Sequence, residues 1–461
     1  MIVGKGVPDT KHLVDYDANA SQTSHQSPKI QPPEKEYPMT LRTDHPVSTR
    51  AYNDLDISSN PFWDKTFNER DQTFAKLRVA SEAGLTWHEP LVADYPHNET
   101  GFWAATRNED IAYISKHHEI FSSAEGIAVS PLPKEAQEFV SFFLMMDPPQ
   151  HAMFRRLVSS AFTPRNVARI QAQIEANARE IVDSLIGAGE VDFVTACSGI
   201  LPMRTVSDMI GIAPENREAV RRAAEAMFAG VSEDPLDEGV DTITFLLNQM
   251  MLLRNSAIEI AQDRRAHPKD DLMTAIVQAE VEGHKLSDEE IGAFMVLLST
   301  AGNDTTKQTT SHTLLALDRY PEQREWLLAD LDNRIGTAIE EFVRYASPVM
   351  DFSRTAKVDT EIRGARIKAG EKVALFYCSG NRDESAFDAP GEFILNRTPN
   401  HHVGFGGGGV HFCLGSNVAK SQLRALFTEL LTRLPKVEVG EPEWLPNQFV
   451  HGIKRLPVRI G

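Results

Sequence analysis

Cys413 is preceded by a loop in which four consecutive glycines, at positions 406–409, separate Phe405 from Val410. Gly415 comes two residues after the cysteine. Glycine allows the backbone to approach a sulfur atom or a large planar group, because no Cβ stands in the way. A metal-bound thiolate also accepts hydrogen bonds from backbone N–H groups, which such a loop can supply. The loop is therefore suited to holding a metal-bound cysteine thiolate.

The residues after this loop have helical periodicity, which predicts a helix over 416–434. Cys413 then lies near the N-terminus of that helix, where the helix dipole favours an anion such as a thiolate. A thiolate, a glycine-rich loop and a helix N-terminus together are typical of a site where cysteine binds haem iron.

Two alternatives apply to this loop. A lone cysteine is often a small buried apolar residue, and a run of glycines is often a flexible loop, but neither explains the combination. Zinc is the sharper alternative, because three histidines lie nearby: His401, His402 and His411. Structural zinc sites usually contain paired cysteines at short spacing, whereas Cys197 and Cys378 are isolated. Zinc is therefore the less favoured metal.

A second group of reactive residues lies in a predicted helix over 288–319, which begins with a capping box at Ser287. Gly302, which costs about 1 kcal/mol in a helix interior, interrupts its apolar pattern beside Asp304 and Thr305. Hydroxyl groups that bond back to carbonyls can widen a helix locally. An acid beside an alcohol can then relay protons; a simple packing kink is the alternative.

Two pairs of charged residues also have helical spacing. Glu341 and Arg344 lie three residues apart, so they can form an ion pair, although a solvated surface pair has the same pattern. His151 and Arg155 follow two prolines and lie four residues apart, where two donors can converge on a carboxylate. A neutral histidine on a surface helix is the alternative for this second pair.

The composition excludes several functions. The chain has 461 residues and a net charge of −18, which argues against nucleic-acid binding. Three scattered cysteines predict no disulfide framework, so a cytoplasmic location is expected. The N-terminus has no signal-peptide pattern, and the longest apolar stretch, 293–298, is too short to span a membrane.

The expected architecture is mainly α with small β-sheets. Residues 1–46 are polar and are expected to form a disordered or extended arm, whereas 47–461 are expected to form a single domain. Further helices are predicted over 166–185, 215–228 and 242–266. The predicted strands cover 85–87, 102–106, 355–362, 372–378 and 449–460.

These motifs, together with Asn381-Arg382-Asp383, resemble the motif set of a bacterial cytochrome P450 and occur in that family's order over residues 54–461. Phe405 lies eight residues before Cys413, one more than in the commonest form of the loop. This extra residue is similar to the actinobacterial subgroup that oxidises terminal methyl groups of steroid side chains and methyl-branched lipids. Two further stretches, 270–283 and 447–457, point to the same subgroup.

The resemblance implies the cytochrome P450 fold, with haem b held between the 288–319 helix and the Cys413 loop. Cys413 would be the iron ligand, Phe405 would shield its sulfur, and Gly415 would let the next turn lie close to the ring. Four residues would hold the haem propionates: His151, Arg155, Arg354 and His411. Glu341 and Arg344 would form a structural pair behind the haem, joined by Arg397.

The implied reaction is monooxygenation of an apolar lipid, steroid or terpenoid, with Asp304 and Thr305 supplying protons for dioxygen cleavage. The expected substrate-lining residues are Leu297, Ala301, Val349, Met350, Phe352, Phe449 and Val450. Electrons would come from a separate ferredoxin and its reductase, since the chain has no recognisable iron–sulfur, flavin or dinucleotide motif. A basic docking patch is expected from Arg156, Lys420 and Arg424. The alternatives are a peroxide-driven peroxygenase and a non-catalytic haem-thiolate sensor.

Overall fold

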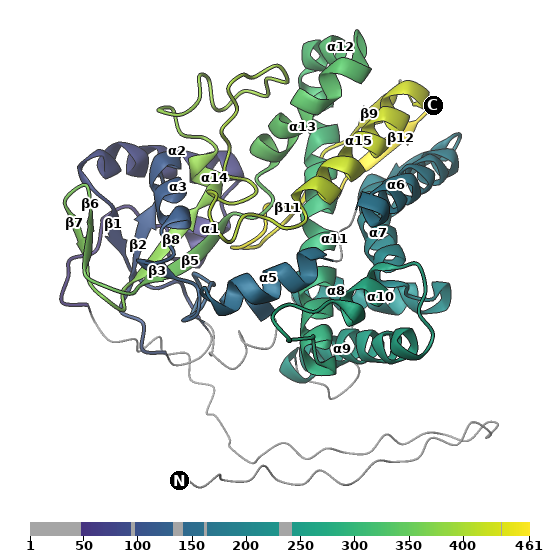
Figure 1. Cartoon of the computed structure of the whole chain (residues 1–461). Helices are drawn as coiled ribbons and strands as arrows, with labels where there is room; N and C mark the ends of the chain where they lie inside the picture. Colours follow the sequence, from purple (N-terminus) through teal and green to yellow (C-terminus); the bar gives the residue numbers. More distant parts are fainter. Residues whose placement is uncertain (1–47, 94–96, 132–141, 161–163, 230–241, 435) are drawn as a thin grey trace, which may run out of the picture. The chain divides into compact units, whose positions relative to one another are not determined.

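The longest helix, α11 (Asp288–Arg319), lies at the centre of the helical part of the structure (Figure 1). It starts at a capping box between Ser287 and Glu290, as the sequence predicts. Helices pack against α11 from several sides, so its buried residues surround the helix axis instead of forming one stripe. The computed structural model describes residues 48–93, 97–131, 142–160, 164–229, 242–434 and 436–461.

The described residues belong to one compact unit, Thr43–Gly461. The predicted arm over 1–46 lies outside the described residues. Among the residues that the structure describes, no helix has both the length and the apolar character needed to cross a membrane.

Helices in direct contact with α11 are α7 (Ile200–Ile210), α8 (Arg217–Ala229), α9 (Thr242–Ala266), α12 (Pro321–Leu328), α13 (Leu331–Ala346) and α15 (Ser416–Arg433). The other α-helices are α1 (Asn60–Trp63), α2 (Phe67–Ala80), α3 (Asn108–Lys116), α5 (Gln150–Ser160), α6 (Pro164–Leu185), α10 (Leu272–Gln278) and α14 (Tyr377–Gly380). Figure 1 shows α6 and α7 on the opposite side of α11 from the largest sheet.

That sheet has the strand order β1-β2-β8-β5-β3. Its strands are β1 (Thr86–His88), β2 (Phe102–Ala105), β8 (Lys372–Phe376), β5 (Asp351–Ala356) and β3 (Phe121–Ser122). Only the β2–β8 pair is parallel. The smaller sheets contain β4 (Gly189–Asp192), β12 (Pro457–Ile460) and β9 (Val437–Val439); β10 (Glu443–Leu445) and β11 (Gly452–Arg455); and β6 (Thr360–Ile362) and β7 (Ala365–Ile367).

The helix predictions over 242–266 and 288–319 agree with α9 and α11 at both ends. The strand character predicted over 355–362 is divided between two strands, because β5 ends at Ala356 and β6 begins at Thr360. Asp359, in the connection between the two strands, accepts hydrogen bonds from Lys368 and Ala369, which holds that connection against the segment after β7. Helix α11 continues through Gly302, and the Thr305 hydroxyl bonds back to the Ala301 carbonyl, which is the contact expected of the hydroxyl groups in this segment.

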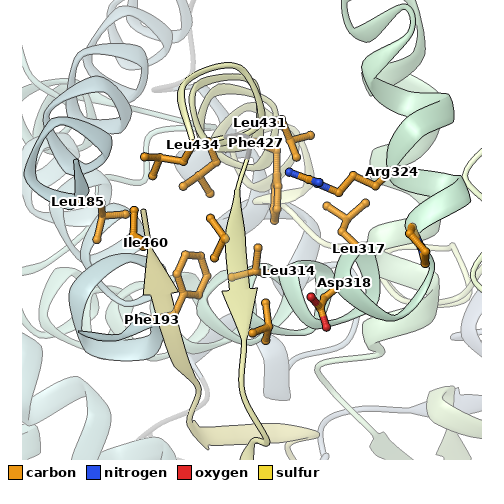
Figure 2. A pocket seen from close by; sticks show the side chains of 14 residues that line it. Leu185, Phe193, Leu314, Leu317, Asp318, Arg324, Phe427, Leu431, Leu434 and Ile460 are labelled. Atoms are coloured by element: carbon orange, nitrogen blue, oxygen red, sulfur yellow. The ribbon is translucent and has the colours of Figure 1, made fainter. Parts of the chain in front are cut away.

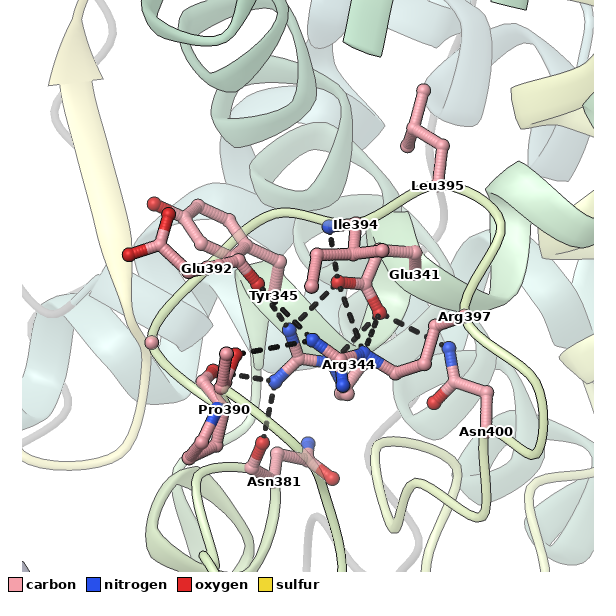
Figure 3. Close-up of polar contacts among 12 residues, drawn as sticks. Glu341, Arg344, Tyr345, Asn381, Pro390, Glu392, Ile394, Leu395, Arg397 and Asn400 are labelled. Atoms are coloured by element: carbon pink, nitrogen blue, oxygen red, sulfur yellow. Dashed lines mark hydrogen bonds and ion pairs between the residues drawn. The ribbon is translucent and has the colours of Figure 1, made fainter.

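A buried polar network connects α13 to the long loop before the cysteine (Figure 3). Glu341 and Arg344 are fully buried and form an ion pair at 2.7 Å. The Glu341 carboxylate also accepts hydrogen bonds from Arg397, Asn400 and the Ile394 backbone N–H. The Arg344 guanidinium also donates to the backbone carbonyls of residues 381, 390 and 392. The network therefore fixes the loop from about 381 to 400 on α13.

We predict that Glu341→Gln destabilises the protein by about 3–5 kcal/mol, because it leaves the Arg344 guanidinium buried without its counter-charge. Denaturant unfolding of the haem-loaded protein measures this loss. Glu180→Gln is the control, since Glu180 pairs with Arg204 at an exposed position and should cost no more than about 1 kcal/mol. Equal effects of the two substitutions would contradict the structural importance of the Glu341 network.

Candidate active site

The loop before α15 turns back on itself, so that Cys413 lies beside Phe405. The Cys413 backbone N–H donates to the Phe405 carbonyl oxygen at 3.0 Å. Three glycines of the loop, Gly406, Gly408 and Gly409, have positive φ angles of 92°, 95° and 74°. Residues with a Cβ rarely adopt this conformation, so the closed turn depends on glycine.

Two loop glycines are also needed for packing against α3, a role that the sequence analysis missed. A Cβ at Gly407 would lie 2.6 Å from Ser115 Oγ and 2.7 Å from the Ile111 carbonyl oxygen. A Cβ at Gly409 would clash with the Ser115 backbone. Gly415 differs, because a Cβ there would meet nothing within 4 Å. The space beside Gly415 therefore agrees with the close approach of a flat ring.

Four cationic or polar residues gather from three separate parts of the chain. His151 and Arg155 lie on α5, Arg354 on β5, and His411 on the cysteine loop. The His151 and His411 ring centroids are 4.2 Å apart, and Arg155 donates to the Phe412 carbonyl oxygen at 2.6 Å. Asp147 holds the start of α5 against β3 by accepting hydrogen bonds from Ser122 and Ser123. The structure thus brings together all four residues expected to hold carboxylates.

The electrostatics of this cluster favour an anionic ligand. Burial, with Arg155 beside it, lowers the pKa of His151 to about 4. Burial, with Arg354 and His151 nearby, lowers the pKa of His411 to about 2. Both ring nitrogens of His151 and Nε2 of His411 are buried and have no hydrogen-bond partner among the described residues. Buried polar atoms of this kind usually have a partner, so the cluster fits the two propionates of haem b.

Part of Cys413 is accessible to solvent. Protein nevertheless surrounds its sulfur, and this burial raises the pKa of the thiol. The N–H groups of Gly415 and Ser416 and the charge of Arg155 act in the opposite direction and favour the thiolate. The solvent accessibility of Cys413 and the burial of its sulfur are compatible if the sulfur faces a concave site. Hydrogen bonds and cationic charge near the sulfur suit an anionic iron ligand.

The zinc alternative finds no support in the described residues, where no three His, Cys, Asp or Glu side chains are arranged to hold a metal ion. His402 instead forms a 3.1 Å contact with Glu340, and His411 lies against His151.

The two residues predicted to supply protons differ in their surroundings. Thr305 is half-buried, and its hydroxyl donates to the carbonyl of exposed Ala301 at 2.9 Å. Asp304 is buried and forms an ion pair with Lys307, which also pairs with Glu225 on α8. Burial raises the pKa of Asp304, although Lys307 opposes this shift. A raised pKa suits a proton donor, but Asp304 must share its carboxylate with Lys307.

The predicted substrate-lining residues fall into two groups. Val349 and Val450 form an isolated β-bridge, and the Phe352 and Phe449 rings lie 5.3 Å apart, so four of the residues lie in two adjacent segments. Met350 differs from these four residues, because its side chain is buried in a core cluster with Phe62, Trp63 and Cys378. Its thioether sulfur also lies 3.5 Å from Arg70. Packing in that core makes Met350 less suited to face a ligand than Val349 or Phe352, which are half-buried.

Leu297 is also buried, in the largest hydrophobic cluster, whereas Ala301 is exposed one turn further along α11. Strand β11, which follows the turn carrying Phe449 and Val450, is anchored to α11, since Gln308 accepts a hydrogen bond from the Ile453 backbone N–H at 2.7 Å. This contact connects the predicted lining segments to the helix that carries Ala301 and Thr305.

An apolar cavity of about 160 Å³ lies elsewhere, between α15, the end of α11 and strands β9 and β12 (Figure 2). Its walls include Leu314, Leu317 and Phe427, with Asp318 and Arg324 at its edge. None of the predicted haem or substrate residues lines it.

The fold and the cysteine site define a haem-thiolate protein, and comparison with known proteins agrees. The cytochrome P450 family model matches residues 236–451. Methyl-branched lipid omega-hydroxylase from Mycobacterium tuberculosis (strain CDC 1551 / Oshkosh) is 40% identical, over 88% of this chain and 94% of that protein. Steroid C26-monooxygenase from Mycolicibacterium smegmatis is 34% identical, over 86% of this chain and 92% of that protein.

A solved structure, Mycobacterium marinum cytochrome P450 CYP268A2 in complex with pseudoionone, is 48% identical and has a TM-score of 0.84. The match covers 89% of this chain and 100% of that one. The chain belongs to the cytochrome P450 family. It is a haem b monooxygenase, and its resemblance to the steroid and methyl-branched-lipid hydroxylase subgroup is confirmed.

We predict that the reduced protein with bound carbon monoxide has the absorption band typical of thiolate-ligated haem. Cys413→His should replace it by the band of histidine-ligated haem, because the iron ligand changes. Cys378→Ala is the control, since Cys378 is a buried thiol in a separate core cluster. A histidine-type band in fresh wild-type protein would exclude Cys413 as the iron ligand.

Proposed function

We propose that this monooxygenase hydroxylates a terminal methyl group of a methyl-branched apolar chain, on a lipid or on a steroid side chain. The observation that carries the proposal is the similarity, over most of the chain, to a methyl-branched lipid omega-hydroxylase and a steroid C26-monooxygenase. The position of Phe405, eight residues before Cys413, supports the same subgroup.

In this proposal, Cys413 binds the haem iron through its thiolate, and Phe405 covers the sulfur. His151, Arg155, Arg354 and His411 hold the haem propionates, which supply the negative charge that this cluster favours. Bound haem supplies the chemistry that activates dioxygen. Glu341 and Arg344, with Arg397, hold the loop behind the haem in position.

The reaction consumes dioxygen, two electrons and two protons: one oxygen atom enters a C–H bond of the substrate and the other leaves as water. We propose that the Thr305 hydroxyl passes a proton into the site, and that Asp304 supplies that proton once its carboxylate separates from Lys307. Proton transfer by such positioned groups typically contributes about 10²–10⁴-fold to a rate.

The substrate pocket is proposed to include Ala301, Val349, Phe352 and Phe449, which are exposed or half-buried. Leu297 and Val450 are buried and would contribute to its wall only through a small part of their surface. Two aromatic rings and aliphatic side chains bind an apolar chain by the hydrophobic effect and add little preference for a particular polar group.

The electrons are proposed to come from a ferredoxin and a ferredoxin reductase. Two of the predicted docking residues already have acidic partners: Arg156 pairs with Glu282, and Lys420 pairs with Glu340. Arg424, on the same helix as Lys420, is the exposed cation that fits such docking better.

A single catalytic domain over 47–461 and a cytoplasmic location also remain predictions.

We predict that Thr305→Ala leaves haem binding and the carbon monoxide band unchanged but lowers the amount of product formed per electron pair by about tenfold or more. The variant removes the hydroxyl that passes protons, so reductant is consumed without hydroxylation. Thr309→Ala is the control, because Thr309 makes the same back-bond one turn further along α11. Unchanged coupling in Thr305→Ala would refute the proton-transfer role.

We predict that methyl-branched fatty acids and sterols with a branched side chain perturb the haem spectrum and are hydroxylated at a terminal methyl, more efficiently than straight-chain acids of equal length. Spectral titration and product analysis with a ferredoxin pair measure this preference. Oxidation at interior carbons would contradict the proposed position. Turnover with peroxide but none with any ferredoxin pair would establish the peroxygenase alternative.

A further inference from the structure

Lys420 is a partly buried cation that contacts both a carboxylate and an aromatic ring. It belongs to the second turn of α15, and its side chain is 33% exposed. Its Nζ atom lies 2.6 Å from Glu340 Oε1 on α13 and 5.1 Å from the centroid of the Phe405 ring. An ammonium group at this distance from an aromatic ring is within the range of a cation–π interaction. Lys420 is therefore held against the residue that turns back beside Cys413.

The partner of Lys420 is fixed from the other side by His402. The Gly404 backbone N–H donates to His402 Nδ1 at 3.1 Å, so the ring proton must be on Nε2. Nε2 then donates to Glu340 Oε2 at 3.1 Å. Both oxygens of the carboxylate consequently have a donor. The hydrogen bond from His402, followed by that from Lys420, lowers the pKa of Glu340 to about 2.

These contacts hold Phe405 between two side chains. The His402 and Phe405 ring centroids are 5.7 Å apart, and Lys420 lies over the same phenylalanine ring. The Phe405 carbonyl oxygen accepts a hydrogen bond from the Cys413 backbone N–H. The ring held by His402 and Lys420 therefore belongs to a residue that is hydrogen-bonded directly to the cysteine. A positive charge held at a defined position near a partly buried loop acts on the site more strongly than a mobile charge in water.

We infer that Lys420 is a positioning residue that raises the reduction potential of the haem iron, by holding a positive charge over Phe405 beside the Cys413 loop. The inference rests on the proposed ligation of iron by Cys413. The Lys420 ammonium offsets the negative charge of Glu340, so a neutral residue at position 420 would leave that carboxylate less compensated beside the loop and make reduction of the iron harder. Lys420 thus acts through Phe405 and the loop, and its main role is not to dock the electron donor.

The test compares Lys420→Gln with Arg424→Gln in the haem-loaded protein. Both substitutions remove one positive charge from the same face of α15, four residues apart, but no contact between Arg424 and Phe405 is found in the described structure. The reduction potential is measured without substrate or ferredoxin. Lys420→Gln should disfavour reduction by about threefold to tenfold, where tenfold corresponds to about 59 mV for one electron. Lys420→Arg should restore most of the wild-type value, and Arg424→Gln should leave it unchanged.

A second measurement separates this role from docking. If Lys420→Gln and Arg424→Gln both leave the potential unchanged and both raise the KM for ferredoxin, then Lys420 is a docking residue and the inference is wrong. Lys420→Met, which keeps an apolar stem over the ring, repeats the test if Gln disturbs the loop. The carbon monoxide band is recorded for every variant. A wild-type band without thiolate character would refute Cys413 ligation itself, whereas a normal band with an unchanged potential would refute only the role of Lys420.

Discussion

The buried carboxylate of Glu341 is the constraint on which the site depends. It is fully excluded from solvent, and a charge in that position is tolerated only because Arg344, Arg397, Asn400 and the Ile394 backbone all donate to it. The same network fixes the loop after β8, and Asn381 continues it by accepting the Val403 N–H through its side chain. Val403 in turn accepts a hydrogen bond from Gly406, where the cysteine loop begins. A chain of polar contacts therefore connects α13 to the loop of Cys413.

The charges of the site are arranged in two different ways: as neutralised pairs in one region and as a cluster of donors in another. Behind the loop, the buried charges are paired, which makes that region rigid. On the other side of the loop, His151, Arg155, Arg354 and His411 gather as donors, and burial lowers the pKa values of both histidines. Such a cluster is unfavourable alone and becomes favourable when a dianionic group binds. Cofactor binding and the stability of this region are therefore coupled through charge.

The sequence predicted this site better than it predicted the packing around it. The resemblance to the family singled out His151, Arg155, Arg354 and His411, and the structure brings these four residues together. Met350 was predicted to line the pocket, whereas its side chain belongs to a core cluster; an apolar side chain in a strand region is equally suited to either place. The sequence suggested that Gly407 and Gly409 let the backbone approach the cysteine sulfur. The structure shows that they also pack closely against Ser115 on α3, a contact between distant parts of the chain that no local pattern predicts.

The sequence alone determined the residue types that do the chemistry, the α-helices that carry them, and the family, because these depend on local periodicity and on short motifs. Tertiary structure decided which charges meet. Lys307 pairs with both Asp304 and Glu225, and Lys420 pairs with Glu340 beside Phe405, although each of these cations could equally have faced solvent. Long charged side chains have many rotamers, and only the packing of α8 and α13 against their neighbours selects one.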